Sequence, residues 1–285
     1  MRNAFKGLML RTVEHSVSAM LGVLPGRLRV MLAERAPMVR RLPYAKARVL
    51  IHVDSWIGLN IRLRSAEREP GTVRWIEEHF AAGDVFYDIG ANVGAYSLVA
   101  AVLHSGKVRV CAFEPSAFNF AQLVRNLALN HCGDTVIPLP VALADRTQPL
   151  VFNYRNVTSG AALHSLGDPV DEQQDVFVPA LRQHVLAYSL DSIIPHYRLP
   201  APTHIKIDVD GAEERVLAGA SQVLASPTLK TVLIEAGPDA TLNARVTTRL
   251  ESAGLNIIQV QPMPGGFSNL LFGRQGAILA KNTIP

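Results

Sequence analysis

The chain has 285 residues, of which 48% are apolar and 18% are charged, and its 20 Gly and 18 Pro are scattered. This composition is typical of a globular protein and excludes disordered, collagen-like and coiled-coil classes. Residues 1–70 carry 13 of the 28 Lys and Arg but 5 of the 24 Asp and Glu, which leaves them at +8 and the remainder at −4. The acidic remainder disfavours a groove that follows nucleic-acid phosphates, so we expect no nucleic-acid partner.

Two sequence features bear on cellular location. Cys111 and Cys132 are too few for a disulfide framework or a Cys-rich zinc site and predict a reducing compartment. The longest charge-free run near the N-terminus, residues 15–26, is shorter than the roughly 20 apolar residues of a membrane span. Glu14 also interrupts the apolar stretch that a secretory signal would need. A cytoplasmic protein is therefore expected, with peripheral attachment to a membrane as an alternative.

The first 70 residues are predicted to form a basic extension. Apolar residues recur at helical spacing from Phe5 to Leu24, and Pro25-Gly26 ends the pattern. Such an amphipathic helix needs an apolar surface, which can be the rest of the chain, a second copy of it or a membrane interface. A strand pair is expected at 49–53 and 58–64. Pro70-Gly71 then marks a boundary, so the sequence predicts an extension over 1–70 and a second domain over 71–285.

From residue 72 on, short apolar runs alternate with helical stretches, which is typical of a parallel α/β sheet. A helix is expected at 72–80. Core strands are expected at 85–89, 108–113, 136–141, 204–209 and 231–235, with further strands at 256–260 and 276–280 around a loop at 262–273. Helices are expected at 96–104, 117–130, 213–224 and 241–252. An insertion at 149–198, with strands at 151–154 and 176–181, is expected to form a substrate wall.

A glycine-bearing turn follows the first core strand. In the segment Asp88-Ile-Gly90-Ala-Asn92-Val-Gly94, Gly90 permits a positive φ and Gly94 permits close approach of another group. A ligand could therefore lie against backbone N–H groups at the helix start. A structural turn without a ligand is the alternative, because the segment matches neither a P-loop nor a strict dinucleotide fingerprint.

The second core strand ends in Glu114, about 20 residues after the glycines. A carboxylate at this place can accept hydrogen bonds from both hydroxyls of a ribose. It can also favour the start of the helix that follows, and the two roles are compatible. Together the turn and the acid predict a nucleoside-binding site.

Three acids cluster after the fourth core strand: Asp208, Asp210 and Glu213. Like charges brought together need a cation, a basic group or a shared proton, so the cluster points to function. The alternative is that Asp210 and Glu213 cap the next helix. An all-oxygen Mg²⁺ or Ca²⁺ site is conceivable, but nothing in the spacing requires it, and no metal is expected.

The order of these motifs, with Asn126–Asn130, Val141–Asp145, Ser159-Gly160 and Leu190-Asp191 between them, resembles the FkbM family of S-adenosylmethionine-dependent methyltransferases. The resemblance covers residues 72–237. It implies a Rossmann-like class I fold, a mostly parallel seven-stranded sheet with helices on both faces, to which the N-terminal helical extension is added. Asp210 departs from the pattern, because the family usually has Glu there.

The resemblance also implies how the cofactor S-adenosylmethionine would be held. The turn with Gly90, Asn92 and Gly94 would hold the methionine part, with Asp88 toward its ammonium. Glu114 would bind the ribose. Ala142 and Asp145 would border the adenine, although Asp145 fits a turn residue equally well.

Methyl transfer to a hydroxyl calls for a base that takes the hydroxyl proton, worth roughly 10²–10⁴-fold in rate. Asp208 is the first candidate, because the tip of the fourth strand faces the transferred methyl in this fold. Glu213 is the second. His164 is the third, with an exposed loop histidine as the alternative.

The predicted function is therefore an O-methyltransferase acting on a hydroxyl of a sugar, a polyketide or another secondary metabolite. One alternative, N-methylation of protein or nucleic acid, is disfavoured because Asp208-Val-Asp210-Gly stands where an Asn/Asp-Pro-Pro-aromatic motif is expected. The other alternative is a nucleoside-binding module without catalysis. Self-association or membrane contact through the N-terminal helix is a further expectation.

Overall fold

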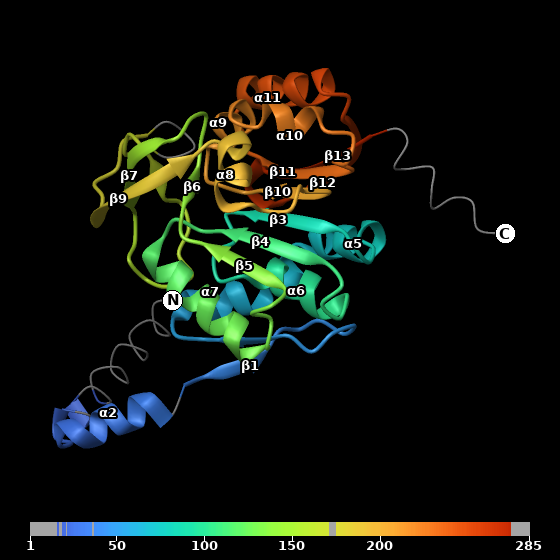
Figure 1. Cartoon of the computed structure of the whole chain (residues 1–285). Helices are drawn as coiled ribbons and strands as arrows, with labels where there is room; N and C mark the ends of the chain where they lie inside the picture. Colours follow the sequence, from blue (N-terminus) through green and yellow to red (C-terminus); the bar gives the residue numbers. More distant parts are fainter. Residues whose placement is uncertain (1–15, 17–18, 21, 36, 171–174, 275–285) are drawn as a thin grey trace. The chain divides into compact units, whose positions relative to one another are not determined.

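The computed structural model describes residues 16, 19–20, 22–35, 37–170 and 175–274, in two compact units that divide after Met38 (Figure 1). The smaller unit contains helix α2 (Gly26–Arg35). The amphipathic helix expected over residues 5–24 falls almost wholly outside the described residues. The larger unit begins at Val39, so residues 39–70, which the sequence had placed in the extension, belong to the same unit as the α/β domain. Among the described residues, none of the helices has the length and apolar character needed to cross a bilayer.

A seven-stranded sheet forms the centre of the larger unit, in the order β12-β13-β11-β10-β3-β4-β5. Five neighbouring strands are parallel, and β13 runs antiparallel to both of its neighbours. The mostly parallel sheet predicted from the sequence is confirmed. The strands are β3 (Val85–Ile89), β4 (Arg109–Phe113), β5 (Val136–Leu139), β10 (His204–Ile207), β11 (Thr231–Ala236), β12 (Asn256–Pro262) and β13 (Ser268–Gly273).

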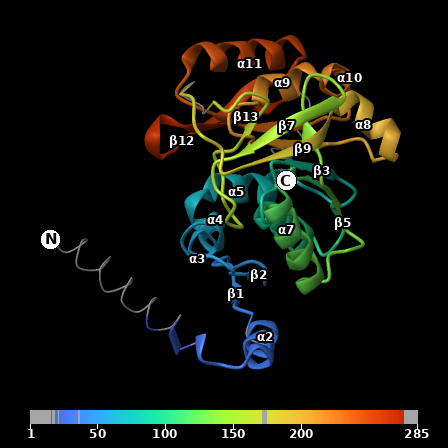
Figure 2. The same ribbon diagram turned by 90° about the vertical axis from the view of Figure 1, so that its left-hand side faces the viewer.

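Helices cover both faces of the sheet (Figures 1 and 2). Every residue of β3 is buried, with Tyr87 and Ile89 in one core and Phe86 in the other. The strand therefore needs no polar alternation. One face packs on α5 (Pro70–His79), α6 (Ala95–Leu103) and α7 (Ala117–Leu129). The other packs on α8 (Leu190–Tyr197), α9 (Glu213–Ala218), α10 (Ser221–Ala225) and α11 (Ala240–Ser252).

The strand pair expected at 49–53 and 58–64 is wrong in its second member. Strand β2 (Leu50–His52) pairs instead with β1 (Val39–Arg41). Residues 56–68 are helical, as α3 (Trp56–Asn60), the 3-10 turn η1 (Arg62–Arg64) and α4 (Ser65–Arg68). The Ser55 side chain caps α3 by accepting from the Gly58 N–H, and Leu59 and Leu63, four residues apart, both pack on the core.

The insertion at 149–198 takes part in a second sheet, in the order β6-β9-β7-β8. Its strands are β6 (Ala142–Leu143), β7 (Gln148–Tyr154), β8 (Ser165–Leu166) and β9 (Leu181–Tyr188). The strand expected at 151–154 lies inside β7. The strand expected at 176–181 is displaced, because β9 begins only at Leu181, the last residue of the expected range. The register of β7 explains this, since Tyr154 pairs with Leu181 and Gln148 with Ala187.

The loop expected at 262–273 is also wrong, because it contains β13. Leu270 and Phe272 enter one core and Leu271 the other, between β11 and β12. A run buried on both faces and flanked by two strands is a strand in spite of the glycines before it. The strand expected at 276–280 lies outside the described residues.

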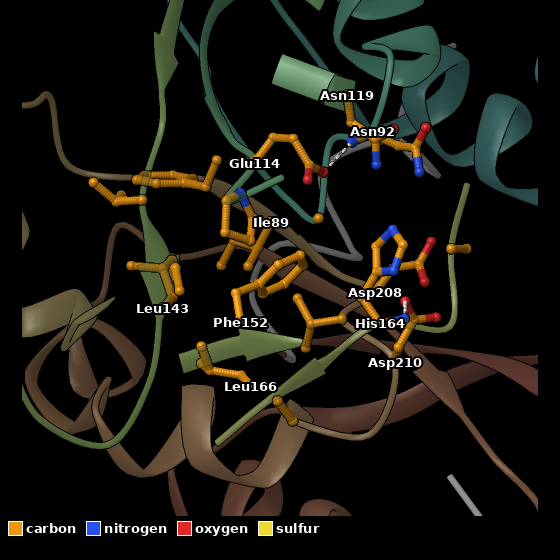
Figure 3. A pocket seen from close by; sticks show the side chains of 18 of the residues that line it. Ile89, Asn92, Glu114, Asn119, Leu143, Phe152, His164, Leu166, Asp208 and Asp210 are labelled. Atoms are coloured by element: carbon orange, nitrogen blue, oxygen red, sulfur yellow. Dashed lines mark hydrogen bonds between the residues drawn. The ribbon is translucent and has the colours of Figure 1, made fainter. Parts of the chain in front are cut away.

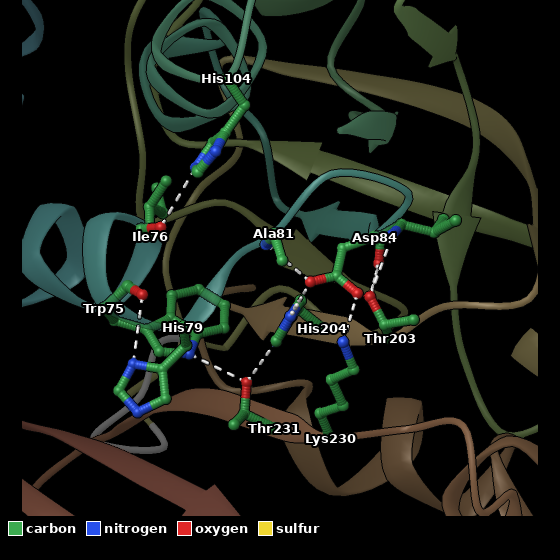
Figure 4. A network of polar contacts seen from close by, with 11 residues as sticks. Trp75, Ile76, His79, Ala81, Asp84, His104, Thr203, His204, Lys230 and Thr231 are labelled. Atoms are coloured by element: carbon green, nitrogen blue, oxygen red, sulfur yellow. Dashed lines mark hydrogen bonds and ion pairs between the residues drawn. The ribbon is translucent and has the colours of Figure 1, made fainter. Parts of the chain in front are cut away.

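A buried polar network fixes the amino ends of β3, β10 and β11 (Figure 4). Thr231 Oγ1 accepts from Trp75 Nε1 at 2.9 Å, so its own proton is available for His204 Nδ1 at 2.7 Å. His204 then carries its proton on Nε2, 3.1 Å from Asp84 Oδ2, and Lys230 donates to Asp84 Oδ1 at 2.6 Å. Burial lowers the pKa of His204 and keeps it neutral. The network ties three strands together at their amino ends, whereas the site described next lies at their carboxyl ends.

Candidate active site

One pocket lies at the carboxyl ends of β3, β4 and β10 (Figure 3). Its wall combines polar groups on one side with an apolar stretch on the other. The polar side chains are Arg62, Asn92, Glu114, Asn119, His164, Asp208 and Asp210. The larger apolar side chains are Ile89, Phe113, Val141, Leu143, Phe152, Leu166 and Val209.

The glycine turn after β3 is braced by the neighbouring strands. Gly90 has φ +82°, and a Cβ there would lie 1.8 Å from the Asp208 carbonyl oxygen. The N–H groups of Gly90 and Ala91 both donate to the Phe113 carbonyl at 3.0 Å, so they are not free for a ligand. Gly94 does not line the pocket; a Cβ there would lie 2.4 Å from Leu123 Cδ1. Both glycines therefore permit close packing within the chain.

Glu114 lies at the end of β4 as the sequence predicts, 4% exposed and in the pocket wall. Its two oxygens accept from the backbone N–H groups of Asn92 and Ser116, both at 2.8 Å. Burial outweighs these hydrogen bonds and raises the pKa of Glu114 to about 7. A carboxylate has about four acceptor sites, so Glu114 can still accept from hydroxyl groups of a ligand.

Two asparagines attach the segment 159–164 to the glycine turn. The amide nitrogens of Asn92 and Asn119 both donate to the Ala161 carbonyl, at 2.9 and 3.1 Å, and Asn119 Oδ1 accepts from the Gly160 N–H at 2.8 Å. Asn92 adopts φ +51° and its Oδ1 is buried without a hydrogen-bond partner among the described residues. The turn thus presents one unpaired acceptor beside the pocket.

The same segment is held at its other end by Asp210. Asp210 Oδ2 accepts from the N–H groups of Leu163 and His164, at 2.8 and 3.2 Å, and Arg62 Nε donates to the Gly160 carbonyl at 2.7 Å. Asp210 therefore shapes the pocket through its contact with this segment.

His164 is buried, at 6% exposed, so the alternative of an exposed loop histidine is wrong. Its Nδ1 accepts from the Arg155 N–H at 3.3 Å, and its Nε2 is buried without a hydrogen-bond partner in the described chain. Burial, helped by Arg62, lowers the pKa of His164 to about 4. The ring is therefore neutral with its proton on Nε2, a donor beside Asp208 and Asp210 (Figure 3).

Asp208 lines the pocket from the tip of β10. Its Oδ2 accepts from Lys206 Nζ at 2.6 Å, and the lysine side chain is only 4% exposed. Burial tends to raise the pKa of Asp208, but the Lys206 ammonium outweighs it and holds that pKa below its usual range. Lys206 and Asp208 therefore form an ion pair at the tip of β10.

Glu213 is placed outside this pocket. Its Oε1 accepts from the backbone N–H groups of Val209 and Gly211, both at 3.2 Å, and burial raises its pKa. Glu213 therefore holds the loop that carries Asp208 from outside the pocket.

Asp88 and Asp145 also lie outside the pocket lining. Asp88 Oδ2 accepts from the N–H and the hydroxyl of Ser97, at 3.1 and 2.6 Å, and the opposite oxygen is buried and unpaired among the described groups. Asp145 Oδ1 accepts from Nη2 and Nε of Arg215, at 3.0 and 3.1 Å. The part of Asp145 toward the adenine stays a prediction. No group of three or more Asp, Glu, His or Cys side chains in the described ranges is placed to hold a metal ion.

Six of the residues predicted from the sequence are brought together in this one pocket: Gly90, Asn92, Glu114, Ala142, His164 and Asp208. The model of the methyltransferase FkbM domain matches residues 88–256, which is more than half of the chain. The chain belongs to the FkbM methyltransferase family. It is a methyltransferase, as the sequence predicted.

Two characterised relatives resemble this FkbM methyltransferase in sequence. Hexuronic acid methyltransferase AglP of Haloferax volcanii is 27% identical over 207 residues, 73% of this chain and 78% of that protein. The 31-O-demethyl-FK506 methyltransferase FkbM of Streptomyces tacrolimicus is 29% identical over 156 residues, 48% of this chain and 59% of that protein. The chain therefore spans less than two thirds of the second relative.

A solved structure shows the same fold. The methyltransferase FkbM of Methylobacillus flagellatus KT superposes with a TM-score of 0.50 and 19% identity, covering 68% of this chain and 44% of that one. The Rossmann-like methyltransferase fold predicted from the sequence is confirmed.

Three pocket residues of this FkbM methyltransferase were missed by the sequence analysis. Arg62 lies outside the matched range, in a segment interpreted as a strand. Asn119 is in the first turn of α7, and Phe152 is in the inserted sheet. The pattern of a single sequence offered no signal for them, because each reaches the pocket through a tertiary contact.

Proposed function

We propose that this chain is an S-adenosylmethionine-dependent O-methyltransferase whose acceptor is a hydroxyl of a sugar or another secondary metabolite. The observation that carries the proposal is the placing of two carboxyl groups, those of the buried Glu114 and the half-buried Asp208, in one pocket. Glu114 ends β4 and Asp208 follows β10, on either side of β3. One can bind a ribose and the other can receive the proton of a hydroxyl.

The residues present fit the cofactor. The free lone pairs of Glu114 suit the ribose hydroxyls, and the apolar wall of Phe113, Leu143 and Phe152 suits a planar adenine. The unpaired Oδ1 of Asn92 is an acceptor for an ammonium or hydroxyl donor. The structure gives Asp88 no place in this pocket, so its role toward the cofactor stays a prediction.

The names of the relatives support the acceptor class. The name of one relative gives a hexuronic acid as its substrate, and the name of the other gives 31-O-demethyl-FK506. Both names describe oxygen-bearing acceptors, whose hydroxyl groups can donate to the acceptor groups of the pocket.

When bound, S-adenosylmethionine supplies a methyl group on a positively charged sulfur. The chain mainly positions the reactants, which can account for roughly 7–11 kcal/mol of a barrier at the upper limit. Asp208 accepts a hydrogen bond from the acceptor hydroxyl, orients it and takes its proton. The neutral His164 donates from Nε2 into the same space. The segment 159–164, held by Asn119 and Asp210, borders this space.

Cofactor binding tests the first half of the proposal. We expect titration calorimetry to show binding of S-adenosylmethionine, and Glu114→Gln to weaken it about 10–100-fold through loss of charge-assisted hydrogen bonds worth about 1.5–3 kcal/mol. Ribose hydroxyls favour the ionised carboxylate, whose pKa is about 7 in the unliganded protein. As the pH increases toward that pKa, the affinity for S-adenosylmethionine should therefore rise by up to about tenfold per pH unit, and above the pKa it should level off. The affinity of the glutamine variant should not depend on pH in this range.

Asp134→Asn, a substitution at an exposed site, is the matched control and should bind as the parent does. Equal affinity of Glu114→Gln and the parent at every pH would refute the ribose assignment. The acceptor is tested by transfer of a radiolabelled methyl group to a panel of uronic acids, neutral sugars and hydroxylated polyketides, with a lysine-rich peptide as the amine comparison. Labelling of the peptide alone would contradict O-methylation.

A further inference from the structure

An acid that the sequence analysis did not single out stands next to Asp208. In the parallel pairing of β10 and β11, Ile207 is opposite Ile234, so the next residues, Asp208 and Glu235, follow side by side on one face of the sheet. Glu235 is in turn opposite Asn269 of β13. The carboxyl ends of three neighbouring strands therefore present a row of polar side chains.

The two carboxyl groups belong to residues that follow paired positions of neighbouring strands. Two ionised carboxylates so placed repel each other, and the repulsion is relieved when one of them holds a proton. Lys206 has its ammonium on Asp208, at 2.6 Å, which makes Asp208 the ionised partner. The proton therefore belongs to Glu235.

The surrounding charges favour the same distribution. Besides Asp208, the groups that act on Glu235 are Lys206 on β10, Glu69 before α5 and Asp210 in the loop after β10. Three acids and one ammonium surround a fourth acid. Arg62, which also lines the pocket, acts on Asp208 as well. Full ionisation would still leave more acids than cations around the half-buried Glu235, and a retained proton reduces this excess.

We propose that Glu235 is a positioning residue of the methyltransferase site, whose carboxyl holds a proton and shares it with Asp208, so that the two acids act as one pair. Its part in methyl transfer rests on the proposed function. Burial and the negative charge of Asp208 raise the pKa of Glu235 to about 9, in agreement with this arrangement.

The pair lies where two pockets adjoin. Asp208 lines the pocket described above, and Glu235 lines a second one that shares Leu166, Asp210 and Ala212 with it. His164, whose Nε2 is buried without a hydrogen-bond partner among the described residues, lies beside Asp208 (Figure 3). A hydroxyl bound beside Asp208 would therefore have His164 on one side and the acid pair on the other.

The proton balance follows from this geometry. As the C–O bond forms and the C–S bond breaks, the O–H electrons stay on the acceptor oxygen and its proton moves to the acid pair, which later releases it to water. A pair that already holds a proton is a weak base. Methyl transfer is therefore favoured in those protein molecules whose acid pair has lost its proton. The fraction of such molecules grows as the pH approaches about 9.

Two measurements on the whole chain without ligands test the inference. The first is infrared spectroscopy of protonated carboxyl groups. One such band should be present in the parent up to about pH 9 and absent from Glu235→Gln. Other buried acids, such as Glu114, give their own bands, so Glu114→Gln serves as the comparison and should remove a band that titrates near pH 7.

The second measurement is the pH dependence of unfolding. The folded protein holds the Glu235 proton and the unfolded chain releases it from about pH 4.5 upward. As the pH rises, the unfolding equilibrium constant of the parent should therefore increase by about tenfold per pH unit relative to that of Glu235→Gln, which means that the parent loses stability. Glu251→Gln removes one exposed carboxylate from α11 and controls for net charge.

Parallel stability curves for the parent and Glu235→Gln, or the absence of a band assigned to Glu235 at pH 7, would overturn the inference. Should the glutamine variant fail to fold, ¹³C-glutamate-labelled parent and Glu114→Gln are titrated together, and both must show a protonated glutamate band that persists to about pH 9. Neither measurement uses cofactor or acceptor, so a failure of the proposed function leaves this test intact.

Discussion

Gly90→Ala is expected to lower the free energy of unfolding by about 2–5 kcal/mol and to abolish cofactor binding. A left-handed backbone costs a non-glycine residue about 1–2 kcal/mol, and a methyl group forced into a packed site costs about 1–3 kcal/mol more. Here the obstacle is rigid, because the new Cβ would lie 1.8 Å from the Asp208 carbonyl oxygen. Backbone cannot swing aside as a side chain can, so the tips of β3 and β10 must separate.

Gly83→Ala provides the matched control. Gly83 has φ +90°, close to the +82° of Gly90, but a Cβ at Gly83 would meet nothing within 4 Å beyond its own chain neighbours. It should cost only the backbone strain of about 1–2 kcal/mol and leave cofactor binding intact. Denaturant unfolding and calorimetry measure both effects. If the two variants lost equal stability, strain rather than the contact with β10 would explain the requirement for glycine.

The central sheet could be predicted from the sequence because its strands are buried on both faces. Continuous apolar runs such as 85–89 and 231–235 leave little choice of structure once helical stretches alternate with them. The expected bounds agree with β3 and β11 to within one residue. Local pattern and tertiary environment favour the same answer there.

The errors fall where a tertiary partner decides. Strand β13 is preceded by Pro264, Gly265 and Gly266, which favour a loop, and only its place between β11 and β12 makes 268–273 a strand. Likewise, residues 58–64 become helical through the Ser55 cap and the contacts of Leu59 and Leu63 with the core. A single sequence does not show which surface will cover such a segment.

The same distinction applies to the site. Acids at strand ends could be found, because parallel strands bring their carboxyl ends to one edge, and Glu114 and Asp208 do meet there. The sequence could not show which acids are already engaged inside the chain, as Glu213 and Asp145 are. Glu235 also ends a predicted strand, so the rule that found Glu114 and Asp208 would have found it as well.

Asp208→Asn is expected to reduce turnover about 10²–10⁴-fold, the range for loss of a positioned base. An amide has nearly the shape of the carboxylate and can still accept from Lys206, but it cannot take the proton of a hydroxyl. The ribose contact of Glu114 is not touched, so affinity for S-adenosylmethionine should stay within a few-fold of the parent. The assay is transfer of a radiolabelled methyl group to whichever hydroxyl acceptor the panel identifies.

The two readouts separate chemistry from folding. Loss of the Asp208 charge leaves the Lys206 ammonium, 4% exposed, without its ion-pair partner, and breaking a buried pair costs about 3–5 kcal/mol of stability. A variant that had lost its fold would lose cofactor affinity together with turnover. Retained affinity with lost turnover would therefore show that Asp208 takes the proton of the acceptor hydroxyl. Full turnover in the asparagine variant would contradict this role. The site would then contribute only the neutral His164 and the orientation of the acceptor.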